Sequence, residues 1–256
     1  MKIYVCVKHV PDTAAKITIL GKNQIDEKVT FIINPYDENA IEEAARLKKQ
    51  VGNAEVIAIT LGKESAESTL RSALAMEADR GILIKTDEYC DSMVTARALK
   101  AAIANDGQPD IIFAGKESID SEGFQTMYRL AARFGMPVVS NVASFSLTHE
   151  KVTVECEREA GAREVIEMQL PCVIGTGKSL NKPSYPTLPA IMKARKKEIK
   201  QIDLASLNIE KSGSCVDVLE LKPAVEKRKA IELKGSPQEV AEEIARILHE
   251  EAKVIP

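Results

Sequence analysis

AEVIAITLGKESAESTLRSALAMEADRGILIK, residues 54–85, holds two short apolar segments with a helical segment between them. Residues 54–60 and 81–85 are rich in Val and Ile, and such nearly continuous apolar runs are typical of strands that are covered on both faces. Residues 65–76 fit a helix. A strand, a helix and a second strand in this order predict two parallel strands of one sheet joined by a helical crossover.

The same alternation extends in both directions along the chain. Further strands are predicted at 2–7, 110–114 and 171–175, and further helices at 92–105 and 125–134. Another helix is predicted to start after Asn34 and to stop at Gly52. Its start has three signals, because Asn34 can cap it, Pro35 takes its first position, and Asp37 and Glu38 place negative charge in its first turn.

Two stretches interrupt this pattern as hairpins, residues 16–33 and residues 142–169, the second with its turn near Gly161. From residue 181 prolines break the chain, so we expect residues 181–256 to form an arm outside a core of residues 1–180. The sequence SPQE at 236–239 is a capping box that predicts a terminal helix to about Glu251. The predicted fold is an α/β, doubly wound, mostly parallel sheet with antiparallel additions and a C-terminal arm that ends in a helix.

The composition excludes several classes of protein. There are 35 Lys and Arg and 38 Asp and Glu residues, a formal charge of −3, whereas a nucleic-acid-binding protein usually has a large basic excess. No apolar run is long enough to span a membrane, and the first residues fit a strand better than a signal peptide. We therefore expect a cytoplasmic protein with no nucleic-acid partner and no membrane span.

Known catalytic motifs are missing from the sequence. Residues 175–179 (GTGKS) resemble the end of a phosphate-binding loop, but Cys172 stands where that motif needs its first glycine. The dinucleotide fingerprint fails because Leu180 stands at its third glycine position. The cysteines form no CxxC pair and the histidines lie in no hydrolase signature, so we expect neither a metal site nor a hydrolase.

The loop at 115–126 (GKESIDSEGFQT) is the best candidate for a binding site. It follows an apolar strand and precedes a helix, and in open α/β sheets ligands bind at the carboxyl ends of strands beside helix N-termini. The loop therefore suits the phosphate of a nucleotide, although an ordinary polar loop would have the same composition. Residues 6–8, after the first strand, and residues 60–62, after the second, are expected to line the same crevice.

Residues 185–200 join an apolar tip to a basic cluster. The tip comprises Leu188, Pro189, Ile191 and Met192, and the cluster comprises Lys193, Arg195, Lys196, Lys197 and Lys200. One interpretation is a turn against the core followed by a solvated helix end. The other is a docking arm, in which the apolar tip supplies affinity and the charges steer an acidic partner.

Five segments, in their order along the chain, resemble the small (beta) subunit of electron transfer flavoproteins. They are VKHVPDT (7–13), INPYDENAIEEAARLK (33–48), TLRSALAMEADRGI (69–82), GKESID (115–120) and LNKPSYPTLPAIMKARKKEI (180–199). The resemblance implies a heterodimer with an alpha subunit, which holds most of a redox-active FAD that the two subunits share. It also implies a structural AMP in this subunit, or a second FAD in electron-bifurcating members.

The resemblance carries particular roles to residues of this chain. The nucleotide site would comprise Cys6, Asn34, Leu61, Gly115, Lys116, Glu117, Ser118, Ile119, Asp120, Gly123, Phe124, Gln125 and Thr126. Thr13 and Tyr36 would lie near the flavin ring, although many members have an aromatic residue in place of Thr13. Residues 181–200 would be a recognition loop for a flavin dehydrogenase, with Leu188 inserted into the partner. Residues 201–256 would pack on the alpha subunit.

The function that we expect is electron transfer by a carrier subunit without catalytic residues of its own. Electrons would come from flavin dehydrogenases, such as the acyl-CoA dehydrogenases of fatty acid oxidation, and pass to a quinone reductase or another acceptor. One alternative is a bifurcating flavoprotein whose second FAD is reduced by NADH. We favour AMP, because residues 26–28 are Asp-Glu-Lys where many bifurcating sequences have Arg-Asp-Gly. Another alternative is a homodimeric adenine-nucleotide-binding protein similar to universal stress proteins.

Overall fold

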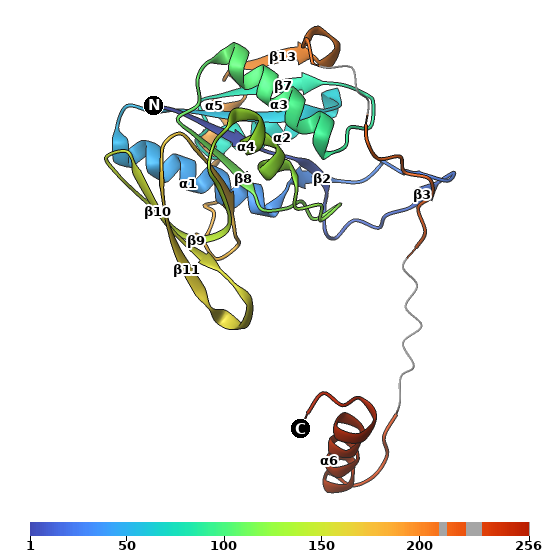
Figure 1. Ribbon diagram of the computed structural model, residues 1–256. Coiled ribbons are helices and arrows are strands. Elements are labelled where there is room, and N and C mark those ends of the chain that lie inside the picture. The colour runs from blue at the N-terminus through green and yellow to red at the C-terminus, as the bar shows by residue number, and fades with distance from the viewer. Residues whose placement is uncertain (210–213, 224–231, 256) are drawn as a thin grey trace. The chain divides into compact units, whose positions relative to one another are not determined.

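A nine-stranded sheet forms the centre of the molecule in the computed structural model, which describes residues 1–209, 214–223 and 232–255 (Figure 1). The strands follow the order β11-β10-β9-β12-β8-β1-β6-β7-β13. The seven strands β9-β12-β8-β1-β6-β7-β13 are parallel to their neighbours in this series. Strand β10 is antiparallel to both β9 and β11. The predicted α/β class and the mostly parallel sheet are therefore confirmed.

The predicted core strands are all present, with small shifts at their ends. They are β1 (Lys2–Cys6), β6 (Glu55–Gly62), β7 (Arg80–Lys85), β8 (Ile111–Gly115) and β12 (Cys172–Thr176). Alternate side chains of these strands enter two separate apolar layers, so that Ile3 and Val5 face one side of the sheet and Tyr4 faces the other. A fully buried Ile or Leu in such a layer stabilises the fold by about 1.5–3 kcal/mol.

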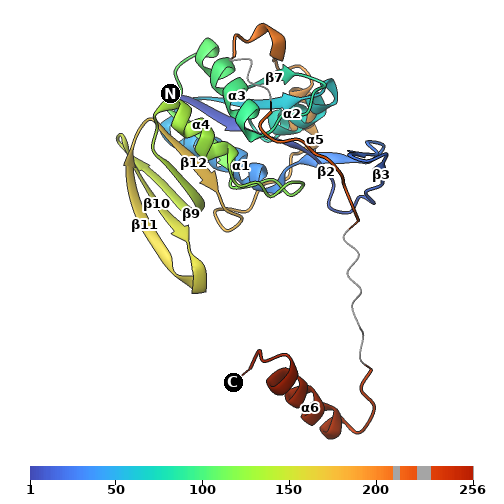
Figure 2. The same cartoon turned by 45° about the vertical axis from the view of Figure 1, so that its right-hand side comes forward.

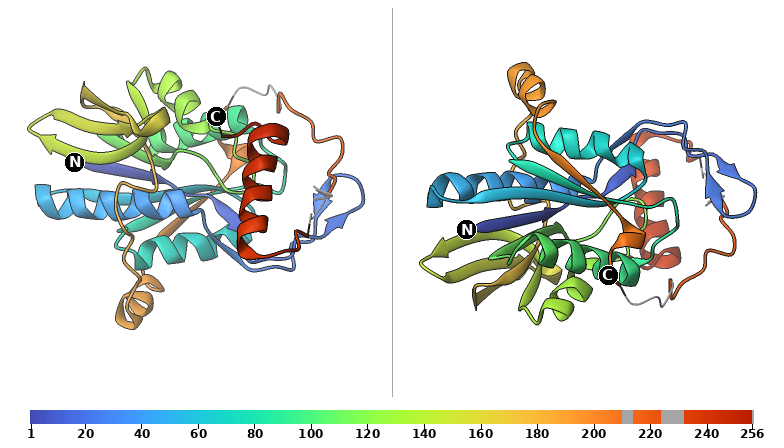
Figure 3. Two further views of the ribbon diagram at one scale, coloured as in Figure 1. Left: turned by 90° about the horizontal axis from the view of Figure 1, so that it is seen from below. Right: turned by 90° about the horizontal axis from the view of Figure 1, so that it is seen from above.

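Helices cover both faces of the sheet, as a doubly wound fold requires (Figure 3). Helices α1 (Pro35–Val51) and α2 (Glu67–Ala75) pack on one apolar layer. Helices α3 (Ser92–Asp106) and α4 (Thr126–Phe134) pack on the other. These four helices begin and end within two residues of the predicted positions.

The antiparallel additions differ in detail from the two predicted hairpins. Strands β9 (Val138–Thr148), β10 (Lys151–Glu157) and β11 (Arg163–Gln169) form a three-stranded extension that Figure 2 shows at one side of the sheet. The chain turns at Gly161, as predicted, but it turns also at His149, which has a φ of 58°. A left-handed histidine is uncommon, so composition gave no sign of this first turn.

The other interruption forms two small antiparallel ribbons. Strand β3 (Ile19–Leu20) pairs with β4 (Gln24–Ile25) around Gly21, whereas β5 (Phe31–Ile33) pairs with β2 (His9–Pro11). The predicted hairpin at 16–33 is thus only partly correct, because its second arm pairs with residues that come before its first arm.

The chain after residue 180 returns to the sheet. It contains helix α5 (Leu188–Ala194) and strand β13 (Ile199–Asp203), which pairs with β7 at the edge of the main sheet. The compact unit that holds the sheet runs from Met1 to Leu219. The sheet therefore extends beyond the core of residues 1–180 that the sequence suggested.

A second unit comprises Glu220–Pro256, and its described part contains α6 (Pro237–Arg246) followed by a π-helical turn, Ile247–Glu251. The capping box is present, because the Ser236 hydroxyl accepts from the Glu239 amide while the Glu239 carboxylate accepts from the Ser236 amide. Parts of the arm that we expected at 181–256, namely residues 210–213 and 224–231, lie outside the described residues. No helix among the described residues is long and apolar enough to cross a membrane.

Candidate functional site at the carboxyl edge of the sheet

The neighbouring strands β1 and β8 lead to helices on opposite faces of the sheet. Strand β1 continues toward α1 on one face, and β8 continues into α4 on the other. A crevice forms where two adjacent connections separate in this way, and ligands of open α/β sheets bind in it. The segments that border this crevice are the start of α1 and the loop at 115–125, so the predicted site lies at the switch point of the sheet.

Asn34 ties these two segments together. Its side chain is buried and donates from Nδ2 to the Glu117 carbonyl (2.8 Å) and to Oδ1 of Asp37 (3.0 Å). Its Oδ1 accepts from the Ile119 amide at 3.1 Å. Asn34 occupies the cap position of α1, but its side chain does not cap the helix. The predicted capping bond is therefore wrong, because the Asn34 amide group bonds to the loop and to the Asp37 carboxylate instead.

Asp37 fixes the ends of both strands. Its buried carboxylate accepts from the backbone amides of Lys8 (2.7 Å) and Gly115 (2.9 Å). Burial raises the pKa of Asp37 to about 7, and the bonds from Asn34, Lys8 and Gly115 limit the rise. A Cβ at position 115 would lie 2.3 Å from the Asp37 carboxylate and 2.7 Å from the Cβ of Tyr36. Only glycine fits there.

Lys8 holds the middle of the loop. Its ammonium donates to Oδ1 of Asp120 (2.7 Å) and to the hydroxyls of Ser118 (3.2 Å) and Ser121 (3.3 Å). Burial alone would raise the pKa of Asp120, but the Lys8 cation holds it below its usual value. The sequence predicted that Lys8 borders the crevice at the end of the first strand, but its bonds to the loop could not be foreseen, because a lysine that follows a strand carries no signal of its own.

The end of the loop is strained and the helix that follows is uncapped. Glu122 and Phe124 have φ values of 46° and 51°, which are uncommon for non-glycine residues. Helix α3 is capped, because the Asp91 carboxylate accepts from the amides of Met93 and Val94 in its first turn. In α4, the Gln125 side chain does not cap the helix and instead accepts from the Ser92 hydroxyl at 3.3 Å. The first amides of α4 are thus placed to bind an anion.

Cys6 and Leu61 lie at the ends of the neighbouring strands β1 and β6, and both pack against the apolar layer beneath α3 and α4. Burial raises the pKa of the Cys6 thiol to about 12, with a further contribution from the Asp37 carboxylate. The Cys6 thiol is therefore neutral at physiological pH. The structure brings these two residues to the same face of the sheet as α4, which begins at Thr126; Gln125 is at its cap position, and Gly123 lies just before it in the loop.

Tyr36 and Thr13 lie in different surroundings. Tyr36 is in the first turn of α1, and the Lys116 ammonium lies 5.2 Å from the centre of its ring. Lys116 also pairs with Glu117 at 3.2 Å. Thr13 is exposed in the turn after β2, and its hydroxyl is 3.5 Å from the Asp12 carboxylate. No described bond joins Thr13 to Tyr36 or to the loop.

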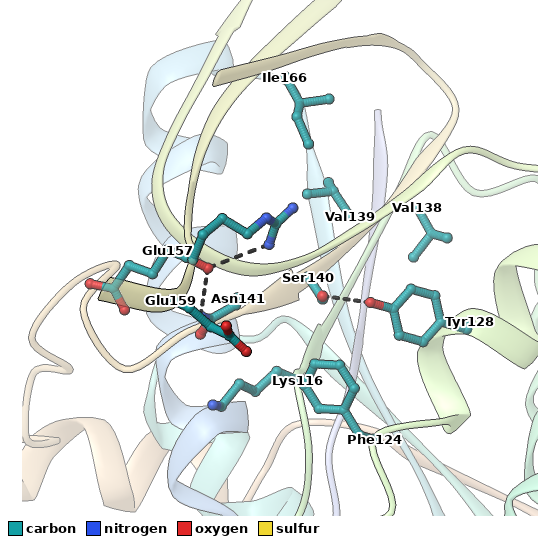
Figure 4. Close-up of a pocket in the computed structure, with 11 residues that line it drawn as sticks. Lys116, Phe124, Tyr128, Val138, Val139, Ser140, Asn141, Glu157, Glu159 and Ile166 are labelled. Atoms are coloured by element: carbon teal, nitrogen blue, oxygen red, sulfur yellow. Dashed lines mark hydrogen bonds between the residues drawn. The ribbon is translucent and has the colours of Figure 1, made fainter. Parts of the chain in front are cut away.

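A cavity of about 620 Å³ lies beside the loop, between α4 and the strands β9–β11 (Figure 4). It shares Lys116 and Phe124 with the loop, and the ring of Phe124 is 5.9 Å from that of Tyr128. The Tyr128 and Ser140 hydroxyls are 2.5 Å apart on its wall. The sequence did not predict this cavity, because its walls come from α4 and from β9, β10 and β11, which are brought together only in the folded protein.

The candidate docking segment exposes its apolar tip. The exposed fraction is 73% for Leu188 and 54% for Met192, while Ile191 and Pro189 are also exposed. Lys196 is exposed as predicted for a steering charge, but the Lys197 ammonium donates to two carbonyls of this chain. Among the described residues, no cluster of three or more His, Cys, Asp or Glu side chains could hold a metal ion.

Comparison with known proteins agrees with this architecture. A family profile described as electron transfer flavoprotein domain matches residues 23–207. The electron transfer flavoprotein subunit beta of Syntrophomonas wolfei is 35% identical over 99% of this chain and 98% of its own length. The subunit beta of Bacillus subtilis is 36% identical over the whole of both chains. The mitochondrial subunit beta of Arabidopsis thaliana is 36% identical over 97% of this chain and 99% of its own.

Proposed function

The chain belongs to the beta-subunit family of electron transfer flavoproteins, and from this premise we propose that it forms a heterodimer with an alpha subunit, shares an FAD with it and holds an AMP. The shared flavin supplies the redox chemistry when it is bound. The residues of this chain bind the nucleotide, shield one side of the flavin and present a docking surface. The observation that carries the nucleotide proposal is the uncapped start of α4, at the end of the loop that follows β8.

Three features of the crevice support a nucleotide phosphate. The first-turn amides of α4 are free of a side-chain cap, the Lys8 cation lies at the loop, and the left-handed Glu122 and Phe124 reorient successive amides before the helix. Amides at a helix N-terminus and in alternating turn conformations bind anions. The neutral Cys6 and Leu61 provide an apolar surface for an adenine ring.

AMP fits the proposal better than a second FAD. Residues 26–28 are Asp-Glu-Lys, and Glu27 forms an ion pair with Lys63 at 2.6 Å, just after the end of β6. The Arg-Asp-Gly of many bifurcating sequences would provide a cation and a glycine at this place. In this chain Asp26 stands where those sequences have the arginine, and Lys28 stands where they have the glycine. This difference supports a carrier with one flavin.

The docking segment 181–200 fits a flavin dehydrogenase as electron donor, such as an acyl-CoA dehydrogenase in fatty acid oxidation. Its exposed Leu188 is the kind of apolar anchor that dominates binding energies, and the exposed Lys196 adds a steering charge. A quinone reductase or a similar protein would accept the electrons. The proposed location is the cytoplasm, although relatives from Arabidopsis thaliana and rice are named as mitochondrial.

The second unit fits the role of packing on the alpha subunit. Helix α6 has no buried residue, and its apolar residues Val240 and Ile244 lie four positions apart on one side. Ile244 is 44% exposed. An amphipathic helix gains most of its stability from packing this side against another surface, which we propose is the alpha subunit.

Co-expression with the alpha subunit tests the proposed function. We expect a one-to-one heterodimer that contains flavin, and we expect its flavin to be reduced when an acyl-CoA dehydrogenase and its acyl-CoA substrate are added. A chain that forms homodimers in the presence of the alpha subunit, and binds adenine nucleotides without flavin, would instead match the alternative related to universal stress proteins.

A further inference from the structure

Helix α5, which carries the proposed docking anchor, is too short to be stable by itself. It has seven residues, and Ala194 is its only buried residue, whereas isolated helices shorter than about 12 residues are marginal in water. In Figure 3 this helix stands out from the body of the protein next to α2. Its orientation must therefore come from interactions with α2 and with the strand that follows.

Arg71 of α2 binds the C-terminal end of α5. Its Nη1 donates to the carbonyls of Ala194 (3.1 Å) and Lys197 (2.6 Å). The same guanidinium is fixed from behind, because its Nε and Nη2 donate to the Glu67 carboxylate one helical turn earlier. Arginine suits this arrangement, since its planar group donates in several fixed directions at once.

Lys197 makes the reciprocal contact. Its ammonium donates to the carbonyls of Leu74 (3.0 Å) and Ala78 (2.6 Å), at the C-terminal end of α2. Each of the two helices thus receives a cation from the other segment at its C-terminal carbonyls, where positive charge is favourable. Burial lowers the pKa of Lys197, and the Lys48 and Lys193 cations lower it further. The Asp79 and Glu77 carboxylates act in the opposite direction. The lysine is therefore a half-buried part of the contact between α2 and α5.

The chain immediately after this clamp is also fixed. The Gly81 amide donates to the Glu198 carbonyl at 2.8 Å, and Ile199 begins the strand that pairs with β7. Rotation of α5 would therefore require breaking either the strand pairing or the four bonds of Arg71 and Lys197 to carbonyls. Leu188 and Met192 extend from a helix whose direction these contacts set.

We propose that Arg71 and Lys197 are positioning residues for electron transfer, which clamp α5 in the orientation that presents Leu188 to a donor dehydrogenase. This inference rests on the proposed docking function. Because neither side chain reaches the exposed apolar tip, both would act through α5. The clamp lowers the ordering cost of docking, since a preformed helix loses less freedom on binding than a mobile one.

The test uses the heterodimer with Lys197→Met, which removes the ammonium and keeps most of the side-chain length. Hydrogen exchange measures the amides of residues 190–197, and steady-state kinetics measure the heterodimer as acceptor for an acyl-CoA dehydrogenase. We expect exchange to rise about tenfold or more, because charged hydrogen bonds are lost, and we expect KM for the heterodimer to rise with little change in kcat. Lys197→Arg should restore part of both effects.

Lys196→Met is the matched control, because Lys196 is the adjacent lysine but is exposed. It should leave hydrogen exchange in α5 unchanged. Arg71→Lys provides a second variant if Lys197→Met does not yield a folded complex, since it keeps the charge but cannot bridge two carbonyls and Glu67. Unchanged exchange in these clamp variants would overturn the proposal, and so would raised exchange with an unchanged KM.

Leu188→Ala separates the clamp from the docking function. If Leu188→Ala raises KM and the clamp variants do not, the positioning role is wrong and the docking function stands. If Leu188→Ala leaves KM unchanged, Leu188 is not the docking anchor, and the positioning role fails with it, whatever the exchange shows.

Discussion

The Asp37 carboxylate accepts a hydrogen bond from the Gly115 amide at 2.9 Å, across 78 positions of sequence. The same carboxylate accepts from the Lys8 amide, so one buried side chain joins the first turn of α1 to the ends of β1 and β8. These are the two strands at the switch point of the sheet. The shape of the proposed nucleotide site therefore depends on a residue that does not itself need to touch the nucleotide.

Asp37→Asn should destabilise the complex by about 1–3 kcal/mol, because an amide nitrogen would face backbone donors that need an acceptor. Denaturant unfolding at neutral pH measures this loss. Glu38→Gln, in the next position of the same helical turn, is the control and should cost less. Equal losses in the two variants would show that the bonds of Asp37 contribute little.

The stability of the protein should depend on pH through Asp37. Its folded pKa of about 7 lies above the ordinary value of 3.8, so the folded state binds the proton more tightly than the unfolded state. The corresponding stabilisation is complete below about pH 4 and is lost as the pH rises to 7, with a slope of up to about 1.4 kcal/mol per pH unit. The difference in unfolding free energy between the natural chain and Asp37→Asn should therefore shrink from pH 4 to pH 7. A difference that stays constant over this range would contradict the raised pKa.

Lys8→Met should loosen the loop and weaken retention of the nucleotide. The ion pair of Lys8 with Asp120 is partly exposed, so global stability should fall by less than about 1 kcal/mol. The measurement is the AMP released per heterodimer after gel filtration, with Lys16→Met as a control at an exposed lysine. Equal AMP contents of the two variants would show that Lys8 does not support the site.

Leu188→Ala should weaken coupling to the dehydrogenase by about 2 kcal/mol, which is the size of effect seen for central apolar anchors. The flavin should stay bound, because Leu188 is 73% exposed and lies outside the crevice. Dehydrogenase-dependent flavin reduction measures the effect, and Tyr185→Ala tests the even more exposed neighbour. Coupling that survives Leu188→Ala and fails in Tyr185→Ala would move the anchor to Tyr185.

The position of the loop 115–126 at the carboxyl edge of the sheet could be predicted because it depends on strong local signals. The short apolar runs rich in Val and Ile indicated where β1, β6 and β8 lie in the sequence, and Pro35 indicated the start of α1. A parallel sheet then places the ends of such strands on one edge. The loop after β8 follows from this geometry, and its residues from 115 to 125 lie at that edge.

The errors come from interactions between distant residues. Asn34 has the right type and position for a cap, but its side chain is drawn to Glu117 and Ile119, more than 80 positions away. Strand β13 reads IKQID, with no apolar run, because it lies at the sheet edge and buries only part of one face. Lys197 looks like a surface charge until α2 places two carbonyls beside it.

The most direct test of the account is the count of small molecules that acid releases from the purified heterodimer, identified by mass spectrometry. The account predicts one AMP and one FAD for each pair of subunits. Two FAD molecules and no AMP would identify the bifurcating alternative. One FAD and no AMP would contradict the nucleotide site that we propose between β1 and β8.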